Sequence, residues 1–430
     1  MPKTFTPPPG SRVAIVGAGI SGLATAYLLS RRYAVTLFEQ GDYLGGHTNS
    51  VEMTLDGISH PVDTGFLVFN DRTYPNLIAL FAELGVTSYA SDMTFSVSMD
   101  DGKLEWAGSN LDTVFAQRGN LLSPRFWGML RDILRFNRLA ESNLADTRES
   151  GVTLGDLLAR QGYGRAFSDE YLLPMAAAIW SSPTKDILDF PASTFLQFCQ
   201  NHGLLQINDR PQWRSVAGGG RDYVARIAGH LKDIRLRCPV TGVWRDEQGV
   251  RIQSPETEER FDAVVMAGHA PDSLAVLHDA DVRERTMLGA IRYQDNTAWL
   301  HVDTSLLPRR RKVWSAWNYL GRIRESEERP VCVSYLINRL QPLPFQQPVI
   351  VTLNPISRPD ESLTHGCYQY AHPLLDQAAL AAQATLPALQ GRRATWFAGA
   401  WTGYGFHEDG LKSALRVARD FECLPQWAQL

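Results

Sequence analysis

One segment near the N-terminus constrains the fold of this 430-residue chain most strongly. The β-branched run Arg12–Val16 is typical of a buried parallel strand, and it leads into the sequence GAGISG of residues 17–22. A helical stretch follows over residues 23–30, and a second strand pattern over residues 33–38 ends at Glu39. This order of strand, glycine turn, helix, strand and acidic residue predicts a Rossmann-type α/β domain.

Each glycine of the motif has a physical role. We expect Gly17 to allow the tight turn, Gly19 to let the backbone approach a diphosphate, and Gly22 to let helix and strand pack closely. The helix that follows offers unpaired N–H groups and a positive dipole end to phosphate. A GxGxxG sequence alone is weak evidence, but this one stands between two strand patterns, as a dinucleotide site requires.

An acidic residue completes the nucleotide site. Glu39 follows the second strand, where a carboxylate accepts hydrogen bonds from both ribose hydroxyls and repels a 2′-phosphate. The segment does not by itself separate NAD from FAD. Its predicted cofactor-binding residues are Gly17, Gly19, Ile20, Ser21, Gly22, Glu39 and Gln40.

Three further segments favour FAD, because they resemble motifs of the flavin-containing amine oxidase superfamily. Residues 43–48 (YLGGHT) resemble the GG-R-xx-[ST] motif, and residues 240–267 resemble the adenine-side hairpin and return strand. Residues 395–415 resemble the closing motif, a strand ending in Ala-Gly and then a helix whose N-terminus faces the flavin ring. The resemblance implies a role in binding FAD for Gly45, Gly46, His47, Thr48, Gly65, Phe66, Leu67, Val240, Gly399, Ala400, Glu408, Asp409, Gly410 and Leu411.

The chain also resembles a bacterial branch of this superfamily, found beside cyclopropane-fatty-acid synthase-like methyltransferases. The likeness covers nearly the whole chain and includes the sequences GGHTNS (45–50), PVDTGF (61–66) and GYGFHEDGL (403–411). It implies a lipid or other apolar substrate and suggests a methyltransferase as a partner.

Departures from the superfamily pattern are equally informative. His47 stands where an arginine is usual, and Ala400 stands where an acidic residue usually holds the ribityl chain. The strand pattern Tyr293–His301 lacks the lysine that amine oxidases place near the flavin. No cysteine adjoins the closing motif, so we expect FAD to be bound non-covalently. Ordinary amine oxidation is therefore disfavoured.

The superfamily pattern also divides the chain. It predicts a discontinuous FAD-binding domain from residues 11–69, 211–275 and 391–430. Residues 70–210 and 276–390 then form an inserted α+β substrate domain, with a helical part at about 110–205.

Composition excludes several classes of function. A net charge of −4 argues against a nucleic-acid-binding protein. The five cysteines are scattered without a CxxC pair, which supports neither a disulfide framework nor a metal site and fits a cytoplasmic protein. Residues 13–30 are uncharged but glycine-rich, so we interpret them as strand, turn and buried helix rather than a membrane segment.

Two stretches could contact the inner face of a membrane. Residues 123–140 form a basic amphipathic pattern, with Arg131, Arg135 and Arg138 on one face and apolar residues on another. Residues 309–312 are four adjacent cations, which suit anionic headgroups. Either stretch could instead be a solvated surface, and the sequence leaves both alternatives open.

The candidates for catalysis come from the closing motif and one strand. His407, Glu408 and Tyr404 lie in the motif that faces the flavin, and a histidine suits proton transfer near neutral pH. A His-Glu pair at a helix start could equally cap the helix. His301 lies in an apolar strand, where a satisfied core histidine is the alternative.

These observations predict an FAD-dependent oxidoreductase that desaturates or otherwise oxidises a lipid acyl chain near a double bond or methyl branch. A flavin amine or amino-acid oxidase and a redox-neutral fatty-acyl double-bond isomerase are the alternatives. A flavin-bound membrane adaptor for a methyltransferase is the non-enzymatic alternative.

Overall fold

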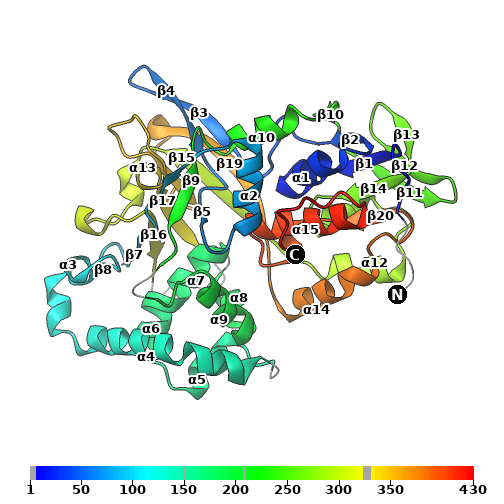
Figure 1. The fold of residues 1–430 in the computed structure, drawn as a ribbon. Coiled ribbons are helices and arrows are strands. Elements are labelled where there is room, and N and C mark those ends of the chain that lie inside the picture. Colours follow the sequence, from blue (N-terminus) through cyan, green and yellow to red (C-terminus); the bar gives the residue numbers. More distant parts are fainter. Residues whose placement is uncertain (1–5, 149–150, 182, 207–209, 323–330) are drawn as a thin grey trace.

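The computed structural model describes residues 6–148, 151–181, 183–206, 210–322 and 331–430. Its two halves are built on different sheets, a five-stranded parallel sheet and a seven-stranded mixed sheet with a group of helices beside it (Figure 1). The predicted fold class, a Rossmann-type α/β domain with an inserted α+β domain, is confirmed.

The parallel sheet has the order β10-β2-β1-β14-β20. Its strands are β1 (Arg12–Val16), β2 (Ala34–Phe38), β10 (Asp233–Arg235), β14 (Ala263–Met266) and β20 (Thr395–Phe397). All five lie within the three chain pieces expected to form the FAD-binding domain. Side chains alternate between two cores, because Val13 and Ile15 face one side of β1 while Ala14 faces the other.

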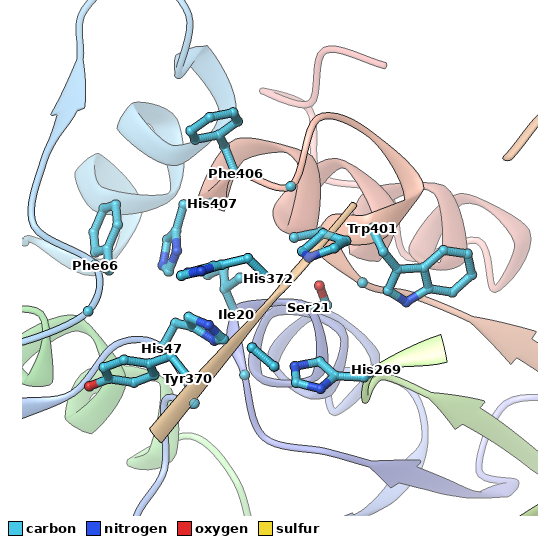
Figure 2. A pocket seen from close by; sticks show the side chains of 18 of the residues that line it. Ile20, Ser21, His47, Phe66, His269, Tyr370, His372, Trp401, Phe406 and His407 are labelled. Carbon is cyan, nitrogen blue, oxygen red and sulfur yellow. The ribbon is translucent and has the colours of Figure 1, made fainter. Parts of the chain in front are cut away.

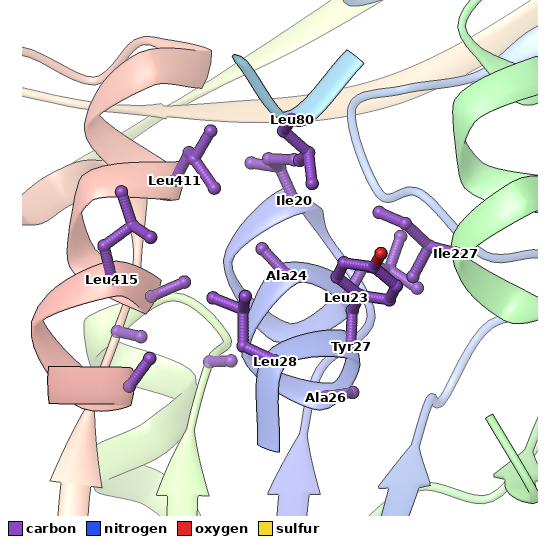
Figure 3. Close-up of a cluster of buried hydrophobic side chains, with 14 of the residues drawn as sticks. Ile20, Leu23, Ala24, Ala26, Tyr27, Leu28, Leu80, Ile227, Leu411 and Leu415 are labelled. Atoms are coloured by element: carbon purple, nitrogen blue, oxygen red, sulfur yellow. The ribbon is translucent and has the colours of Figure 1, made fainter. Parts of the chain in front are cut away.

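Helices cover the first face of this sheet. They are α1 (Ile20–Leu29), α2 (Pro75–Leu84), α10 (Arg221–Ala228) and α15 (His407–Asp420). Figure 3 shows Leu23 and Leu28 of α1 between Leu415 of α15 and Ile227 of α10. Every residue of α1 is buried, which explains the uncharged stretch at residues 13–30 without a membrane. None of the described helices is long and apolar enough to cross a bilayer.

An antiparallel sheet and three helices cover the second face. The strands are β11 (Gly242–Asp246), β12 (Gly249–Gln253) and β13 (Glu258–Phe261), and the helices are α11 (Ala270–Val276), α12 (Val282–Gly289) and α14 (Gln377–Thr385). The strand expected to return to the parallel sheet before residue 267 is broken at Asp262. The carboxylate of Asp262 accepts the N–H of Arg12 at 2.7 Å. Residues 258–261 therefore join β12, and residues 263–266 join the parallel sheet.

The seven-stranded sheet has the order β19-β15-β18-β17-β16-β7-β8. Its strands are β7 (Phe95–Met99), β8 (Leu104–Ala107), β15 (Tyr293–His301), β16 (Trp317–Gly321), β17 (Cys332–Leu336), β18 (Ile350–Leu353) and β19 (Thr364–Pro373). Two smaller sheets complete the fold. One is the ribbon of β3 (Ser50–Leu55) and β4 (Ile58–Asp63), and the other contains β5 (Phe69–Asn70), β9 (Trp213–Val216) and β6 (Ser88–Ala90) in that order.

The helical group spans residues 111–201, close to the helical part expected at 110–205. Its helices are α3 (Leu111–Val114), α4 (Pro124–Thr147), α5 (Leu154–Arg160), α6 (Arg165–Phe167), α7 (Leu173–Trp180), α8 (Thr184–Leu188) and α9 (Ala192–Asn201). The amphipathic stretch forms α4, but its basic face is only partly free. Arg135 lies over the ring of Tyr163 at 4.0 Å, whereas Arg131 is exposed.

Candidate active site

One cavity of about 620 Å³ extends from the parallel sheet to the seven-stranded sheet. Figure 2 shows side chains that line it from α1, from the loop after β2, from β19 and from the closing segment. The lining includes most of the predicted cofactor residues, namely Gly17, Gly19, Ile20, Ser21, Glu39, Gln40, Gly45, Gly46, His47, Gly65, Phe66, Leu67, Val240, Gly399 and Ala400.

The glycine turn between β1 and α1 forms the floor of one end. Gly17 has φ +103°, and a Cβ on Gly22 would lie 1.8 Å from the carbonyl oxygen of Gly17. A Cβ on Gly19 would meet no atom within 4 Å. Gly17 and Gly22 are thus required by the fold, while Gly19 keeps open the space in front of α1 that a diphosphate needs.

The loop after β2 packs directly on this turn. The N–H of Gly45 donates to the carbonyl of Ala18 at 2.9 Å, and a Cβ on Gly46 would lie 3.2 Å from the Cα of Gly19. Gly45 and Gly46 both have positive φ, at +117° and +57°. The two glycine motifs therefore form one surface although Gly45 lies 26 positions after Gly19 in the sequence.

Glu39 lies at the edge of the same end. Its two carboxylate oxygens accept the N–H groups of Ala18 and Gly41, each at 2.8 Å. Because each oxygen keeps another lone pair, the carboxylate can still accept a ribose hydroxyl. Cys238 also lines this end, with its N–H donating to the carbonyl of Glu39 at 2.9 Å.

The closing segment forms a strand and then a helix, as expected. Helix α15 begins at His407, because the carboxylate of Asp409 accepts the N–H of Phe406 at 3.0 Å and caps the helix there. Gly410 and Leu411 face α1 instead of the cavity. A Cβ on Gly410 would lie 2.7 Å from Ile20 Cγ2, so this glycine allows the starts of the two helices to touch.

Glu408 does not reach the cavity, which corrects its assignment to both catalysis and cofactor binding. Its buried carboxylate accepts the N–H of Asn76 at 3.1 Å, the Asn76 amide at 2.7 Å and the N–H of Leu77 at 3.0 Å. The first N–H groups of a helix have no partner within the helix, and Glu408 supplies one at the start of α2. Glu408 is therefore a structural cap that joins α15 to α2.

His407 lines the cavity, but its surroundings do not support the expected proton shuttle. It stacks on Phe66 with ring centroids 3.7 Å apart, and its Nε2 lies 2.7 Å from the Tyr223 hydroxyl and 3.2 Å from Thr48. Burial lowers the pKa of His407 to about 3. The ring is therefore neutral at pH 7, and Thr48 acts by positioning it rather than by lining the cavity.

His301 lies outside the cavity, which corrects its candidacy as a base. Its Nε2 is 2.7 Å from the hydroxyl of Thr352, and its Nδ1 accepts the N–H of Asp303 at 3.1 Å. Burial lowers its pKa to about 4. It is the satisfied core histidine that the sequence left as the alternative.

The far end of the cavity is lined by aromatic and aliphatic side chains. The rings of Phe198 and Phe406 stack at 4.9 Å, and Trp180 and Tyr404 pack on Phe198 at 4.5 and 5.9 Å. Tyr404, a predicted catalytic residue, therefore lines the cavity at this end. The other residues of this end are Tyr74, Met93, Ile179, Ser181, His202, Leu204, Trp213, Trp317, Tyr335 and Leu353.

Charge is distributed very unevenly over the described lining. It contains no lysine or arginine, and its only carboxylates are Glu39 and Asp272, both beside the parallel sheet. Among the residues that the structure describes at the apolar end, none carries an ionised side chain. Three histidines that the sequence did not single out, His202, His269 and His372, also line the cavity, because no local motif marks them.

Comparison with known proteins agrees with this geometry. A family model described as flavin containing amine oxidoreductase matches residues 20–298, and the chain belongs to this family. A carotenoid phi-ring synthase of Streptomyces griseus is 28% identical over 278 residues, which are 59% of this chain and 52% of that protein. The chain thus spans about half the length of the curated relatives it matches.

Solved structures share the fold. Putrescine oxidase bound to putrescine has a TM-score of 0.66 at 17% identity, over 97% of this chain and 100% of its own. A CLA-producing fatty acid isomerase from P. acnes has a TM-score of 0.64 at 17% identity, over 95% and 98%. At 17% identity these likenesses show the shared fold.

The residues present fit the FAD that the family implies. The open space at Gly19 lies before the N-terminus of α1, and Glu39 lies at the end of β2 with lone pairs free for a ribose. Val240, which the sequence predicts to lie beside adenine, also lines the cavity.

Proposed function

We propose that this enzyme oxidises a neutral, apolar substrate, a lipid acyl chain near a double bond or methyl branch, with non-covalently bound FAD. The observation that carries the proposal is the absence of ionised side chains among the described residues of the apolar end. A buried charge without a partner costs several kcal/mol, so this end favours an uncharged hydrocarbon.

The chain's own residues would position the substrate and exclude water. Phe198, Phe406 and Trp180 form a continuous aromatic wall, and Tyr404 packs on Phe198 of this wall. Burial raises the pKa of Tyr404, so its phenol stays neutral and can donate a hydrogen bond to a polar group of the substrate. FAD, when bound, supplies the two-electron acceptor.

Two similar proteins, a carotenoid phi-ring synthase and a fatty acid isomerase, are named for apolar compounds, which supports an apolar substrate here. The second keeps open a redox-neutral isomerisation of a fatty-acyl double bond. Putrescine oxidase shares the fold as well, but a diamine is a dication and the apolar end described here offers it no carboxylate.

Purified holoenzyme mixed anaerobically with cellular lipid extract tests the proposal. We expect the visible absorbance of the oxidised flavin to fall and a lipid to lose two hydrogen atoms by mass spectrometry. A lipid rearranged at unchanged mass would identify the isomerase instead. Loss of flavin absorbance with a panel of amines, and no loss with lipids, would overturn the proposal.

A surface beside α4 combines exposed apolar side chains with cations, as a lipid-contacting surface would. Leu111 and Leu122 are 77% and 89% exposed, and Trp127 is half-exposed. Arg118 and Lys312 both pair with Asp112, which joins the basic stretch at residues 309–312 to the segment that precedes α4. We propose that this α3–α4 surface docks on an anionic bilayer, since exposed apolar side chains beside cations suit a headgroup interface.

Cosedimentation of the full chain with vesicles tests this contact. We expect binding to vesicles rich in phosphatidylglycerol, weaker binding to phosphatidylcholine, and loss of binding in Leu122→Asp. Val282→Asp is the matched control, because Val282 is 75% exposed on α12 of the other half. Equal effects of the two substitutions would contradict the assignment. Association with a methyltransferase remains a prediction, which copurification would test.

A further inference from the structure

Three histidines from distant parts of the chain meet at the nucleotide end of the cavity. His47 follows the glycine pair after β2, His269 precedes α11, and His372 lies near the end of β19. The ring of His47 is 5.1 Å from that of His372 and 6.2 Å from that of His269. We call these three residues the histidine cluster.

The cluster lies beside the turn expected to hold phosphate. His47 follows Gly46, whose Cβ position is 3.2 Å from Gly19 Cα. His269 follows Gly268, whose N–H lies 3.0 Å from the Cβ position of Gly17. Figure 2 shows the three rings around the start of α1. The cluster and the helix N-terminus therefore face the same part of the cavity.

Hydrogen bonds determine which nitrogen of the His372 ring carries the proton. The N–H of Thr297 donates to Asn354 Oδ1 at 2.8 Å, so the Asn354 amide nitrogen donates to Asn296 Oδ1 at 2.7 Å. The Asn296 amide nitrogen is then the donor to His372 Nδ1, at 2.9 Å. A neutral His372 therefore carries its proton on Nε2. His47 Nε2 is buried and has no hydrogen-bond partner among the described residues.

The histidine cluster matters because the described cavity lining offers an anion no permanent cation. A diphosphate is an anion, yet no lysine or arginine occurs among the described residues that line the cavity. His47 stands where the amine oxidase motif has an arginine. Burial lowers the pKa of His47 well below its ordinary range and that of His372 to about 4, so both rings are neutral at pH 7 until an anion arrives.

We propose that the histidine cluster binds the diphosphate of the cofactor in place of an arginine, and that it takes up a proton when the cofactor binds. The anion favours the charged form of an imidazole, so the cluster binds more protons with cofactor than without it. Lower pH therefore tightens binding, and affinity falls as pH rises.

Other ionisable groups around the cluster do not titrate in the relevant range. They are Tyr43 in the loop after β2, Asp272 on α11, Tyr293 on β15, Tyr370 on β19 and His407 on α15. Burial raises the pKa of the three tyrosines, and burial lowers that of His407 to about 3. The hydrogen bond from His269 lowers the pKa of Asp272, which stays ionised.

The dissociation constant of FAD from the holoenzyme, followed by the fluorescence of released FAD between about pH 5.5 and 8.5, tests the proposal. Uptake of one proton makes Kd rise with pH, approaching about tenfold per pH unit. A Kd that does not change with pH in the wild-type protein would overturn the proposal. No substrate is present, so this result is independent of the proposed reaction.

Variants identify the groups responsible. His47→Arg supplies a permanent cation, so we expect a lower Kd and a flatter pH dependence. His372→Gln should weaken FAD binding more at pH 6 than at pH 8. His301→Gln is the matched control, a buried histidine outside the cavity, and should keep the wild-type slope. An unchanged slope in each of His47→Arg, His372→Gln and His269→Gln would contradict the assignment of the proton to the cluster.

Discussion

The two ends of the cavity are built in opposite ways. At the nucleotide end, backbone groups of two glycine loops and the start of α1 form the surface, and Glu39 and Asp272 supply its carboxylates. At the apolar end, side chains from α7, α9, β9 and the seven-stranded sheet form the walls, and the described lining has no ionised group. The nucleotide end is suited to one cofactor, whereas the side chains of the apolar end determine which substrate can enter.

This difference means that substitutions should separate cofactor binding from substrate choice. Changes at the nucleotide end should alter FAD occupancy, whereas changes at the apolar end should alter turnover with occupancy retained. Residues that join the halves without touching the cavity should alter stability alone.

The largest effect is expected from the glycines of the first turn. Gly19→Val and Gly22→Ala should both lower FAD occupancy by on the order of tenfold or more, since each fills or deforms the cradle before α1. Only Gly22→Ala should also destabilise the apoprotein, because its Cβ would lie 1.8 Å from a carbonyl oxygen. Thermal unfolding with and without added FAD measures both effects. Equal apoprotein stability of the two variants would contradict the different roles given to these glycines.

At the apolar end, Met93→Glu introduces a carboxylate on a partly buried lining residue. We expect about tenfold slower oxidation of a neutral lipid, since burying the new charge or neutralising it costs on the order of 1–3 kcal/mol. FAD occupancy should not change, and Met93→Leu should behave as wild type. Loss of FAD in Met93→Glu, measured by the flavin-to-protein absorbance ratio, would break the separation of the two ends.

The sequence predicted the nucleotide end well and the apolar end poorly, for a physical reason. The turn at Gly17 and Gly22 depends on neighbours a few residues away, so a local pattern reveals it. At the apolar end, Trp180 and His202 both pack on Phe198, and no spacing in the sequence marks them because separate elements bring them together. Glu408 was misassigned because its partners, at the start of α2, lie more than 330 residues earlier in the chain.

Glu408 provides the third prediction. Glu408→Gln keeps one acceptor oxygen but loses charge-assisted bonds to the start of α2, so it should lower the free energy of unfolding by about 1–3 kcal/mol. The rate of flavin reduction per bound FAD should stay unchanged. Glu422→Gln is the control, since that side chain is exposed and should have no measurable effect. Slower reduction with unchanged stability would return Glu408 to the catalytic group.

The smallest expected effect is a pH dependence from Asp409. Burial raises the pKa of this capping carboxylate to about 6, so the folded protein holds its proton more tightly than the unfolded chain. The stability it contributes is therefore present below about pH 4 and is lost as pH rises to about 6, on the order of 1–3 kcal/mol. Denaturant titrations at pH 4 and 6.5 should show a smaller decrease in Asp409→Asn than in wild type. The same decrease in both would assign it to another group.

The central claim, that the apolar end selects a neutral hydrocarbon, is tested most directly with three substrates that share one chain and differ only in the head. Anaerobic stopped-flow reduction of the holoenzyme flavin by methyl oleate, oleic acid and oleylamine isolates head charge from chain length. We predict that the neutral ester reduces the flavin fastest. Fastest reduction by oleylamine would contradict the account and make the enzyme an amine oxidase in substrate as well as in family.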